Sequence, residues 1–326
     1  MALTRVNRGH PEWVEAIVSD VSHSKCVPQD DMPPARNVTL SLMERIGGQL
    51  SRRVPLWWRS FDLPNGALSV SFDDFPKSAW QMGGAVLAQR GVKATYYTSG
   101  GLCGRHAMGL RQFDLDDLQA VYEAEHEIGC HTYGHLSAYR HSAAEYAASI
   151  KANKRFLEDR LPGLTMQSFA YPYGHAPLAH RRCASRLYLS CRGVATCADR
   201  ALNRRTVDPS LLMSVGLWAG QRRKRDISSL IADAAERKGW LILSTHDVHD
   251  RPSPYGCTPA ELDQAISLAQ AAGLDIGPVG TMMLRGTTNH TAKGSALPKS
   301  PGRSEAEVRG SSGDSATRRC RVLPGR

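Results

Sequence analysis

The chain has no long hydrophobic run. It contains 326 residues, but its apolar segments are short, and none approaches the roughly 20 residues that a helix needs to cross a bilayer. Residues 1–20 are polar and are interrupted by Pro11, so they lack the apolar core of a signal peptide. We therefore expect a cytoplasmic protein without a membrane span.

Closely spaced cysteine pairs are also absent, since no C-x-x-C motif occurs. A chain of this length can build a large core and does not need a disulfide scaffold. We therefore expect the cysteines to be reduced thiols or small buried apolar side chains. The eight cysteines are Cys26, Cys103, Cys130, Cys183, Cys191, Cys197, Cys257 and Cys320.

Residues 286–326 contain no dense basic block and no interleaved aromatic residues, although the net charge of the chain is +10. Half of that excess lies in residues 286–326, which are rich in Gly, Ser, Thr and Pro and nearly free of large apolar side chains. Such a composition cannot offset the entropy of ordering, so it predicts a disordered basic tail. We expect no nucleic-acid partner.

What the chain does contain, between residues 66 and 285, is a repeated alternation of strand and helix patterns. This alternation predicts a parallel sheet, and up to eight strands favour closure into a barrel. Residues 1–65 are interpreted as an N-terminal extension with helical patterns near 11–20 and 38–50. The predicted strands are 67–72, 94–98, 128–131, 168–171, 187–192, 211–217, 240–246 and 275–279, and the predicted helices are 78–90, 115–126, 142–161, 226–238 and 258–272.

Polar or turn-forming residues follow four of these strands. Asp73 and Asp74 follow the first, His131 ends the third, Pro172-Tyr173-Gly174 follows the fourth, and His246 ends the seventh. In a parallel barrel these strand ends meet at one rim, where catalytic groups gather. The convergence is stronger evidence than any single motif.

The spacing of His131 and His135 lets both imidazoles reach one point if the chain turns helically between them. With a carboxylate from the first strand they make three metal ligands and leave a position open for water. One of the adjacent aspartates would bind the metal and the other would take a proton from the bound water. Taken alone, each pattern also fits ordinary surface or core histidines and exposed turn aspartates.

Two further groups complete a hydrolytic site. The Tyr173 N–H, in a loop stiffened by Pro172, can donate to a developing oxyanion. His246 can protonate a leaving amine, with Asp247, His249 or Asp250 as neighbours that could tune it. An ordinary Pro-Tyr-Gly turn and a structural histidine are the alternatives.

Four segments resemble, in order, the motifs of the polysaccharide deacetylases with a NodB homology domain, a carbohydrate esterase type. The resemblance covers about two thirds of the chain. The segments are Ser71-Phe72-Asp73-Asp74, His131-Thr132-Tyr133-Gly134-His135, Pro172-Tyr173-Gly174 and the apolar strand that ends in Ser244-Thr245-His246.

The resemblance implies a distorted (β/α) barrel that removes N-acetyl groups from an N-acetylated sugar, oligosaccharide or polysaccharide. It implies one divalent metal ion, zinc by default, held by Asp74, His131 and His135. By the same match Asp73 would be the base, the Tyr173 N–H an oxyanion donor, and His246 the acid.

Three positions depart from the family pattern. Phe75 stands where many members have Gly, which would reshape the pocket floor, and Ala170 stands where many have an Arg that orients the base. The aspartate-rich fourth motif has no match in 211–220, so the carboxylate partner of His246 is open. Two other functions remain: hydrolysis of a non-sugar C–N bond, as in a cyclic amide or formamide, and glycan binding without catalysis.

Overall fold

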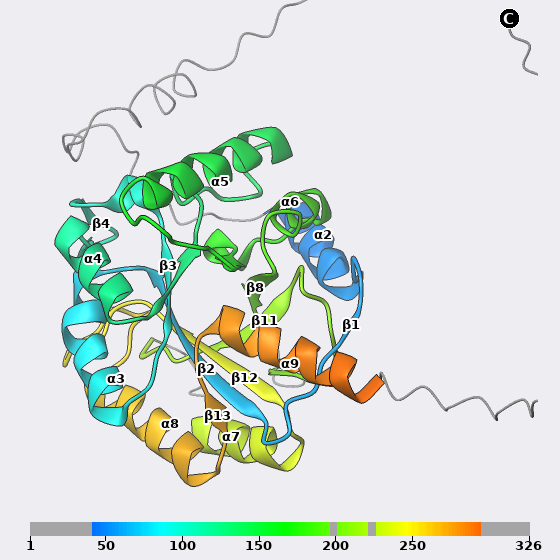
Figure 1. Ribbon diagram of the computed structural model, residues 1–326. Coiled ribbons are helices and arrows are strands. Elements are labelled where there is room, and N and C mark those ends of the chain that lie inside the picture. The colour runs from blue at the N-terminus through cyan, green and yellow to red at the C-terminus, as the bar shows by residue number, and fades with distance from the viewer. Residues whose placement is uncertain (1–40, 196–200, 221–225, 295–326) are drawn as a thin grey trace, which may run out of the picture.

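Seven parallel strands form a closed barrel in the computed structural model, which describes residues 41–195, 201–220 and 226–294 (Figure 1). The ring closes because the last of these strands, β12, pairs in parallel with the first, β2, over six residue pairs. In order around the ring the strands are β2 (Ala67–Asp74), β3 (Thr95–Thr98), β6 (Glu127–Cys130), β7 (Ser168–Ala170), β8 (Ser190–Val194), β11 (Leu212–Gly216) and β12 (Trp240–Thr245).

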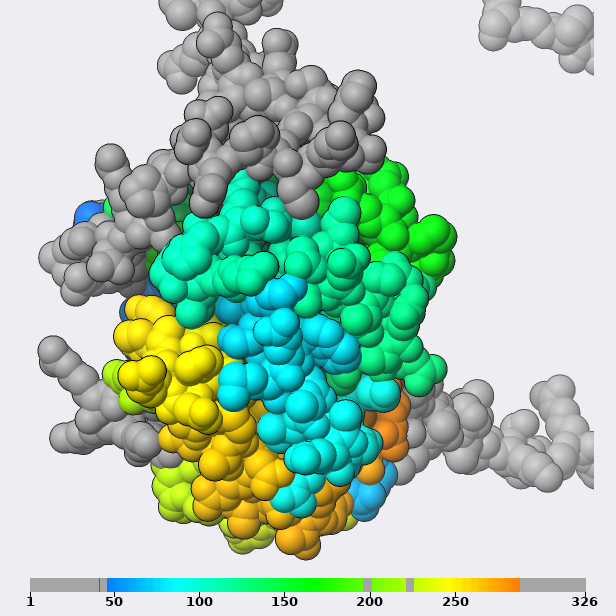
Figure 2. All heavy atoms as spheres, turned by 90° about the vertical axis from the view of Figure 1, so that its left-hand side faces the viewer, coloured from blue at the N-terminus to red at the C-terminus, as the bar shows by residue number. Residues whose placement is uncertain are grey.

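Helices surround this ring (Figure 1). All five predicted helices are present, and the one at 258–272 has the predicted cap, in which Thr258 accepts from the N–H of Glu261. The helical segments are α2 (Leu42–Arg53), the π-helical turn η1 (Ala79–Gly84), α3 (Ala85–Arg90), the 3₁₀ turn η2 (Gly100–Leu102), α4 (Leu115–Glu123), α5 (Ala143–Glu158), the 3₁₀ turn η3 (Pro172–Gly174), α6 (Leu178–Ala184), α7 (Ile227–Glu236), α8 (Pro259–Ala271) and α9 (Val279–Gly294). On the face shown in Figure 2, α3 lies beside α8, to which Arg90 is joined by an ion pair with Asp263.

The first barrel strand alternates between two environments. Leu68, Val70 and Phe72 belong to the main hydrophobic core. Ser71 and Asp73, on the alternate positions, bond to other strands of the ring: Ser71 Oγ donates to the carbonyl of Leu243, and Asp73 pairs with a β8 side chain. Since β8 is not a neighbour of β2 in the ring, the second contact crosses the barrel interior.

Six short strands lie outside the ring. β1 (Arg59–Ser60) pairs with β10 (Thr206–Val207), β4 (His106–Ala107) pairs with β5 (Leu110–Arg111), and β9 (Leu202–Asn203) lies antiparallel to β12. The predicted eighth strand is β13 (Asp275–Ile276), which pairs only with the start of β2. The ring therefore contains seven of the up to eight predicted strands, because this segment is too short to join it.

The predicted boundary at 285/286 falls inside α9, which continues to Gly294. The helix is held by Val279, Met282 and Met283, which are buried in a second core cluster with Trp240. The first part of α9 is therefore packed against the core, although the polar composition of the tail did not indicate a helix that continues past residue 285. Residues 295–326 and the predicted helix near 11–20 lie outside the described residues.

Two expectations about composition can be compared with the described residues. Cys103, Cys130, Cys183, Cys191 and Cys257 are free thiols, and all but Cys183 are buried. In the same part of the chain, no helix combines the length and hydropathy that a bilayer crossing requires.

Candidate active site

Asp74, His131 and His135 converge at the carboxyl end of the barrel strands. Asp74 Oδ1 lies 3.0 Å from His135 Nε2 and 3.5 Å from His131 Nε2. One side-chain ligand atom from each of the three residues lies within 4.8 Å of the others. The side chains are nearly inaccessible, so the three groups form a compact buried cluster.

The backbone around this cluster is strained. Asp74 has φ 65°, Thr132 φ 59°, His135 φ 49° and Tyr173 φ 59°, all in the left-handed region that favours glycine. Such conformations cost about 1–3 kcal/mol each and persist only where the surroundings fix them. The strain is therefore concentrated in the residues that the motifs single out.

The cluster fits a divalent cation. Asp74 Oδ1 is buried without a hydrogen-bond partner, which is costly unless another group binds it. His131 Nδ1 lies 2.9 Å from the carbonyl of Ala170, so Nδ1 carries the proton and Nε2 presents its lone pair to Asp74. Burial lowers the pKa of His131 to about 4 and that of His135 to about 3, so both are neutral near pH 7. One carboxylate and two neutral imidazoles are a ligand set for zinc-type ions.

Asp73, next to this cluster, is paired with Arg192 of β8. Arg192 Nη2 donates to Asp73 Oδ1, Nη1 donates to Ser214 Oγ at 3.0 Å, and the guanidinium lies 4.8 Å from the ring centroid of Tyr97. Burial raises the pKa of Asp73, but the charge of Arg192 and smaller contributions from His131 more than offset it. The carboxylate is therefore ionised at neutral pH.

Arg192 is the residue that the sequence reasoning missed. It pairs in register with Ala170 on the neighbouring strand β7, so the guanidinium that position 170 lacks comes from the adjacent position of the sheet. It has 1% of its surface exposed. A single arginine within a predicted buried strand was the available signal, because such a charge requires a partner.

The loop after β7 places Tyr173 over the cluster. Its ring centroid lies 4.6 Å from that of His135, and burial together with Asp74 raises the pKa of the phenol to about 12. The first N–H groups of a 3₁₀ turn such as η3 have no partner inside the turn. From outside, Arg52 of α2 supports the loop: Nη2 donates to the carbonyl of Gly174 at 2.9 Å and Nη1 to that of Val194 at 2.5 Å.

His246 lies on the other side of Asp74, with Nε2 3.7 Å from Asp74 Oδ2. Its Nδ1 is 3.3 Å from the carbonyl of Tyr255. The nearest carboxylate in sequence, Asp247, accepts instead from the N–H and hydroxyl of Ser253 at 2.8 and 2.5 Å. The partner of His246 is thus a backbone carbonyl, and the rings of Trp218 and Tyr255 flank the imidazole.

Phe75, which stands where the family pattern has glycine, lies in the main hydrophobic core. Its side chain is fully buried and stacks on Phe113 with ring centroids 4.8 Å apart, while Tyr96 lies at 4.9 Å. The backbone of Phe75 has φ 62°. The core contacts of the ring therefore hold a conformation that glycine would adopt without strain.

One family model matches part of this chain in sequence, and several solved structures are similar to it in fold. Residues 62–191 match the family model described as polysaccharide deacetylase. No curated protein matches the chain. At the identities found for solved structures, the likeness concerns the fold alone.

Three solved structures illustrate this likeness. The family 4 carbohydrate esterase from Streptomyces lividans, in complex with acetate, is 18% identical with a TM-score of 0.43, over 65% of this chain and 92% of that one. The family 4 acetyl xylan esterase from Clostridium thermocellum, in complex with a cobalt ion, is 19% identical with a TM-score of 0.47, over 67% and 91%. A family 4 pseudoenzyme from Bacillus anthracis is 15% identical with a TM-score of 0.45, over 68% and 66%.

Proposed function

We propose, from the match of residues 62–191 to the polysaccharide deacetylase family model, that the protein is a metal-dependent hydrolase of N-acetylated saccharides. The substrate would be an N-acetylated sugar, oligosaccharide or polysaccharide, and the products acetate and a free amine. The observation that carries the proposal is the convergence of Asp74, His131 and His135 beside an ionised Asp73.

Asp74, His131 and His135 would hold the cation. When bound there, a divalent ion, zinc by default, lowers the pKa of a water ligand and polarises the amide carbonyl. The protein contributes two neutral imidazoles and a carboxylate whose Oδ1 lacks another partner.

Asp73 is the proposed base. Its Oδ1 is bound by Arg192, which leaves Oδ2 to accept the proton of the attacking water. Because Arg192 is itself fixed by Ser214 and Tyr97, the carboxylate has little freedom to rotate away. A positioned base of this kind contributes about 10²–10⁴ in rate.

His246 and Tyr173 act on the other atoms of the amide. The contact of His246 Nδ1 with the carbonyl of Tyr255 leaves Nε2 directed at the cluster, where a protonated ring can give its proton to the leaving amine. The N–H of Tyr173 donates to the oxyanion, an interaction worth about 3 kcal/mol. Arg52 maintains the loop that presents it.

A substrate panel tests the reaction class. Purified protein, loaded with zinc, is expected to release acetate from N-acetylglucosamine oligomers and to leave cyclic amides unopened. Ring opening without acetate release would replace the saccharide by a non-sugar C–N substrate. Binding of the oligomers without turnover of either substrate would make the domain a glycan-binding module.

A further inference from the structure

A cavity of about 600 Å³ lies outside the active site, between the end of α2 and the segment that contains β9 and β10. None of its lining residues belongs to the cluster of Asp73, Asp74, His131, His135 and His246. The cavity is lined by Arg52, Arg53, Pro55, Trp58, Arg181 and residues 202–208, 211 and 213.

The lining is strongly cationic, with five arginines and one aspartate, a net charge of +4. The aspartate, Asp208, is already saturated. Its Oδ2 accepts from Arg181 Nη2 at 2.5 Å and from the N–H of Leu56 at 2.9 Å, and its Oδ1 accepts from the N–H of Ser210 at 2.9 Å. It therefore cannot neutralise the remaining arginines.

Three of the arginines are exposed: Arg53, Arg204 and Arg205. Within residues 41–195, 201–220 and 226–294, none of the three forms an ion pair with a carboxylate. Arg205 also holds a left-handed backbone conformation, with φ 48°, although glycine or asparagine would fit that turn more easily. Like charges held side by side repel each other, and a bound anion would relieve that repulsion.

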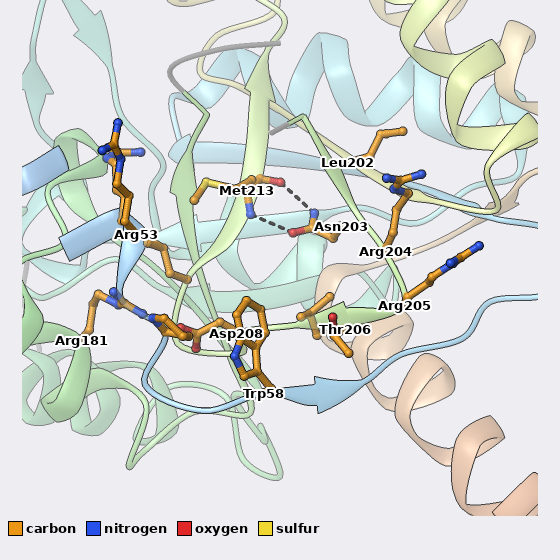
Figure 3. Close-up of a pocket in the computed structure, with 14 residues that line it drawn as sticks. Arg53, Trp58, Arg181, Leu202, Asn203, Arg204, Arg205, Thr206, Asp208 and Met213 are labelled. Carbon is orange, nitrogen blue, oxygen red and sulfur yellow. Dashed lines mark hydrogen bonds and ion pairs between the residues drawn. The ribbon is translucent and has the colours of Figure 1, made fainter. Parts of the chain in front are cut away.

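The arrangement of these side chains suits an elongated ligand. In Figure 3, Arg53 lies at one side of the cavity and Arg204 and Arg205 at the other, with Trp58 below them. Between them, Asn203 is fixed by two hydrogen bonds with the backbone of Met213, at 2.9 and 3.0 Å. Trp58 has 63% of its surface exposed, so its indole face is available to a ring.

We propose that this cavity binds an anionic saccharide, whose phosphate or carboxylate groups pair with Arg53, Arg204 and Arg205 while a sugar ring packs on Trp58. Guanidinium groups bind both kinds of anion through paired N–H donors. The volume lies within the range of small-molecule sites, roughly 300–1,000 Å³. The saccharide part of this proposal rests on the proposed deacetylase function, whereas the preference for anions rests on the cavity alone.

Calorimetric titration of the full chain tests the site. The probes are an oligogalacturonate, a sugar phosphate, a neutral N-acetylglucosamine oligomer and a single-stranded DNA oligonucleotide. The test variant is Arg204→Gln/Arg205→Gln. The control is Arg155→Gln/Arg237→Gln, which removes the same charge from an exposed position on α5 and from the exposed residue that follows α7. We expect the first pair to weaken binding of the oligogalacturonate by roughly tenfold or more at about 50 mM salt, and the second by less than about twofold.

The outcomes separate this site from the catalytic one. If the two double variants lose the same affinity for the oligogalacturonate, the effect comes from net charge and the proposed site is wrong. Unchanged affinity in Arg204→Gln/Arg205→Gln would also overturn the site. Tighter binding of the DNA than of the oligogalacturonate would overturn the saccharide class. If the protein binds the anionic probes but releases no acetate from any substrate, the deacetylase function is refuted and the anion site is retained.

Discussion

Both ends of the barrel bury carboxylates, but the pKa of Glu127 at the amino end and that of Asp73 at the carboxyl end are shifted in opposite directions. At the amino end, Glu127 of β6 accepts from Thr95 Oγ1 at 2.6 Å and from the N–H of Gly280 at 3.0 Å, so it caps the start of α9. At the carboxyl end, Asp73 has a guanidinium partner and Asp74 faces two imidazoles. Burial raises the pKa of Glu127, whereas Arg192 holds that of Asp73 below its usual range. Burial alone therefore does not keep a carboxylate ionised. A cationic side chain beside it, such as Arg192 beside Asp73, is needed to lower its pKa.

The largest expected effect is at the carboxyl end. His131→Ala removes a ligand from the cluster, so we expect loss of the bound metal and a fall in acetate release of more than about 10³-fold, since the cation supplies most of the activation. Metal content and turnover measure both. His106→Ala, an exposed histidine on β4, serves as the control and is expected to keep the metal.

Asp73→Asn is expected to keep the metal and to lose about 10²–10⁴ in turnover, because the base is gone while the ligands remain. Glu127→Gln is the matched change at the opposite end, and we expect its turnover to stay within about twofold of the unmodified protein. Normal turnover in Asp73→Asn would refute the base assignment.

Arg192→Met leaves Asp73 buried without its cation, which is expected to cost about 3–5 kcal/mol of stability near pH 7. The lowered pKa of Asp73 contributes stability above its unfolded-state pKa, and this is lost as pH falls through the folded pKa. The difference between Arg192→Met and the unmodified protein should therefore shrink in acid.

Glu127 should show the opposite sign. Its raised pKa contributes stability below the unfolded-state pKa, and this is lost as pH rises toward the folded value. The effect of Glu127→Gln should hence diminish as pH rises. Urea unfolding of the metal-free proteins across the acid range measures both trends, and parallel trends would contradict the comparison.

The smallest effect is expected from the helix that supports the rim. Arg52→Met removes the hydrogen bonds to the carbonyl of Gly174 in the loop and to that of Val194 at the end of β8, so we expect roughly a tenfold loss in kcat with little change in thermal stability, because mainly the donor loop shifts. Gln49→Met, three residues earlier on α2 and exposed, is the control. Equal kcat values for the two variants would remove Arg52 from the account of the loop.

Much of this site could be predicted from local sequence. The positions of Asp73, Asp74, His131 and His135 follow from strand ends and spacing, and the structure brings these residues together. Arg192 could not be placed, because its contact with Asp73 depends on how far the ring curves before it closes. The carbonyl that faces His246 could not be predicted either, because every residue has a backbone carbonyl and the sequence does not show which one will lie beside the imidazole.

The fold was predictable to a similar degree. The barrel and its five main helices follow from the alternation of patterns, but α9 was obscured by the polar composition of its second half. Its burial depends on Met282 and Met283 reaching Trp240, a contact between distant segments. The strained backbone of Phe75 was equally hidden, because local preference at that position is overruled by ring packing with Phe113.

The contact between Asp73 and Arg192 joins residues 119 positions apart. All three proposed ligands come from residues 74–135, whereas Arg192 lies in β8 and His246 directly follows β12. The proposed base Asp73 and the proposed ligands thus lie in the first half of the polypeptide, whereas the proposed acid and the arginine that fixes the base lie in the second half. Arg192 and His246 approach Asp73 and Asp74 only across the closed barrel, so separation of β12 from β2 is expected to take the site apart even where every one of its residues is intact.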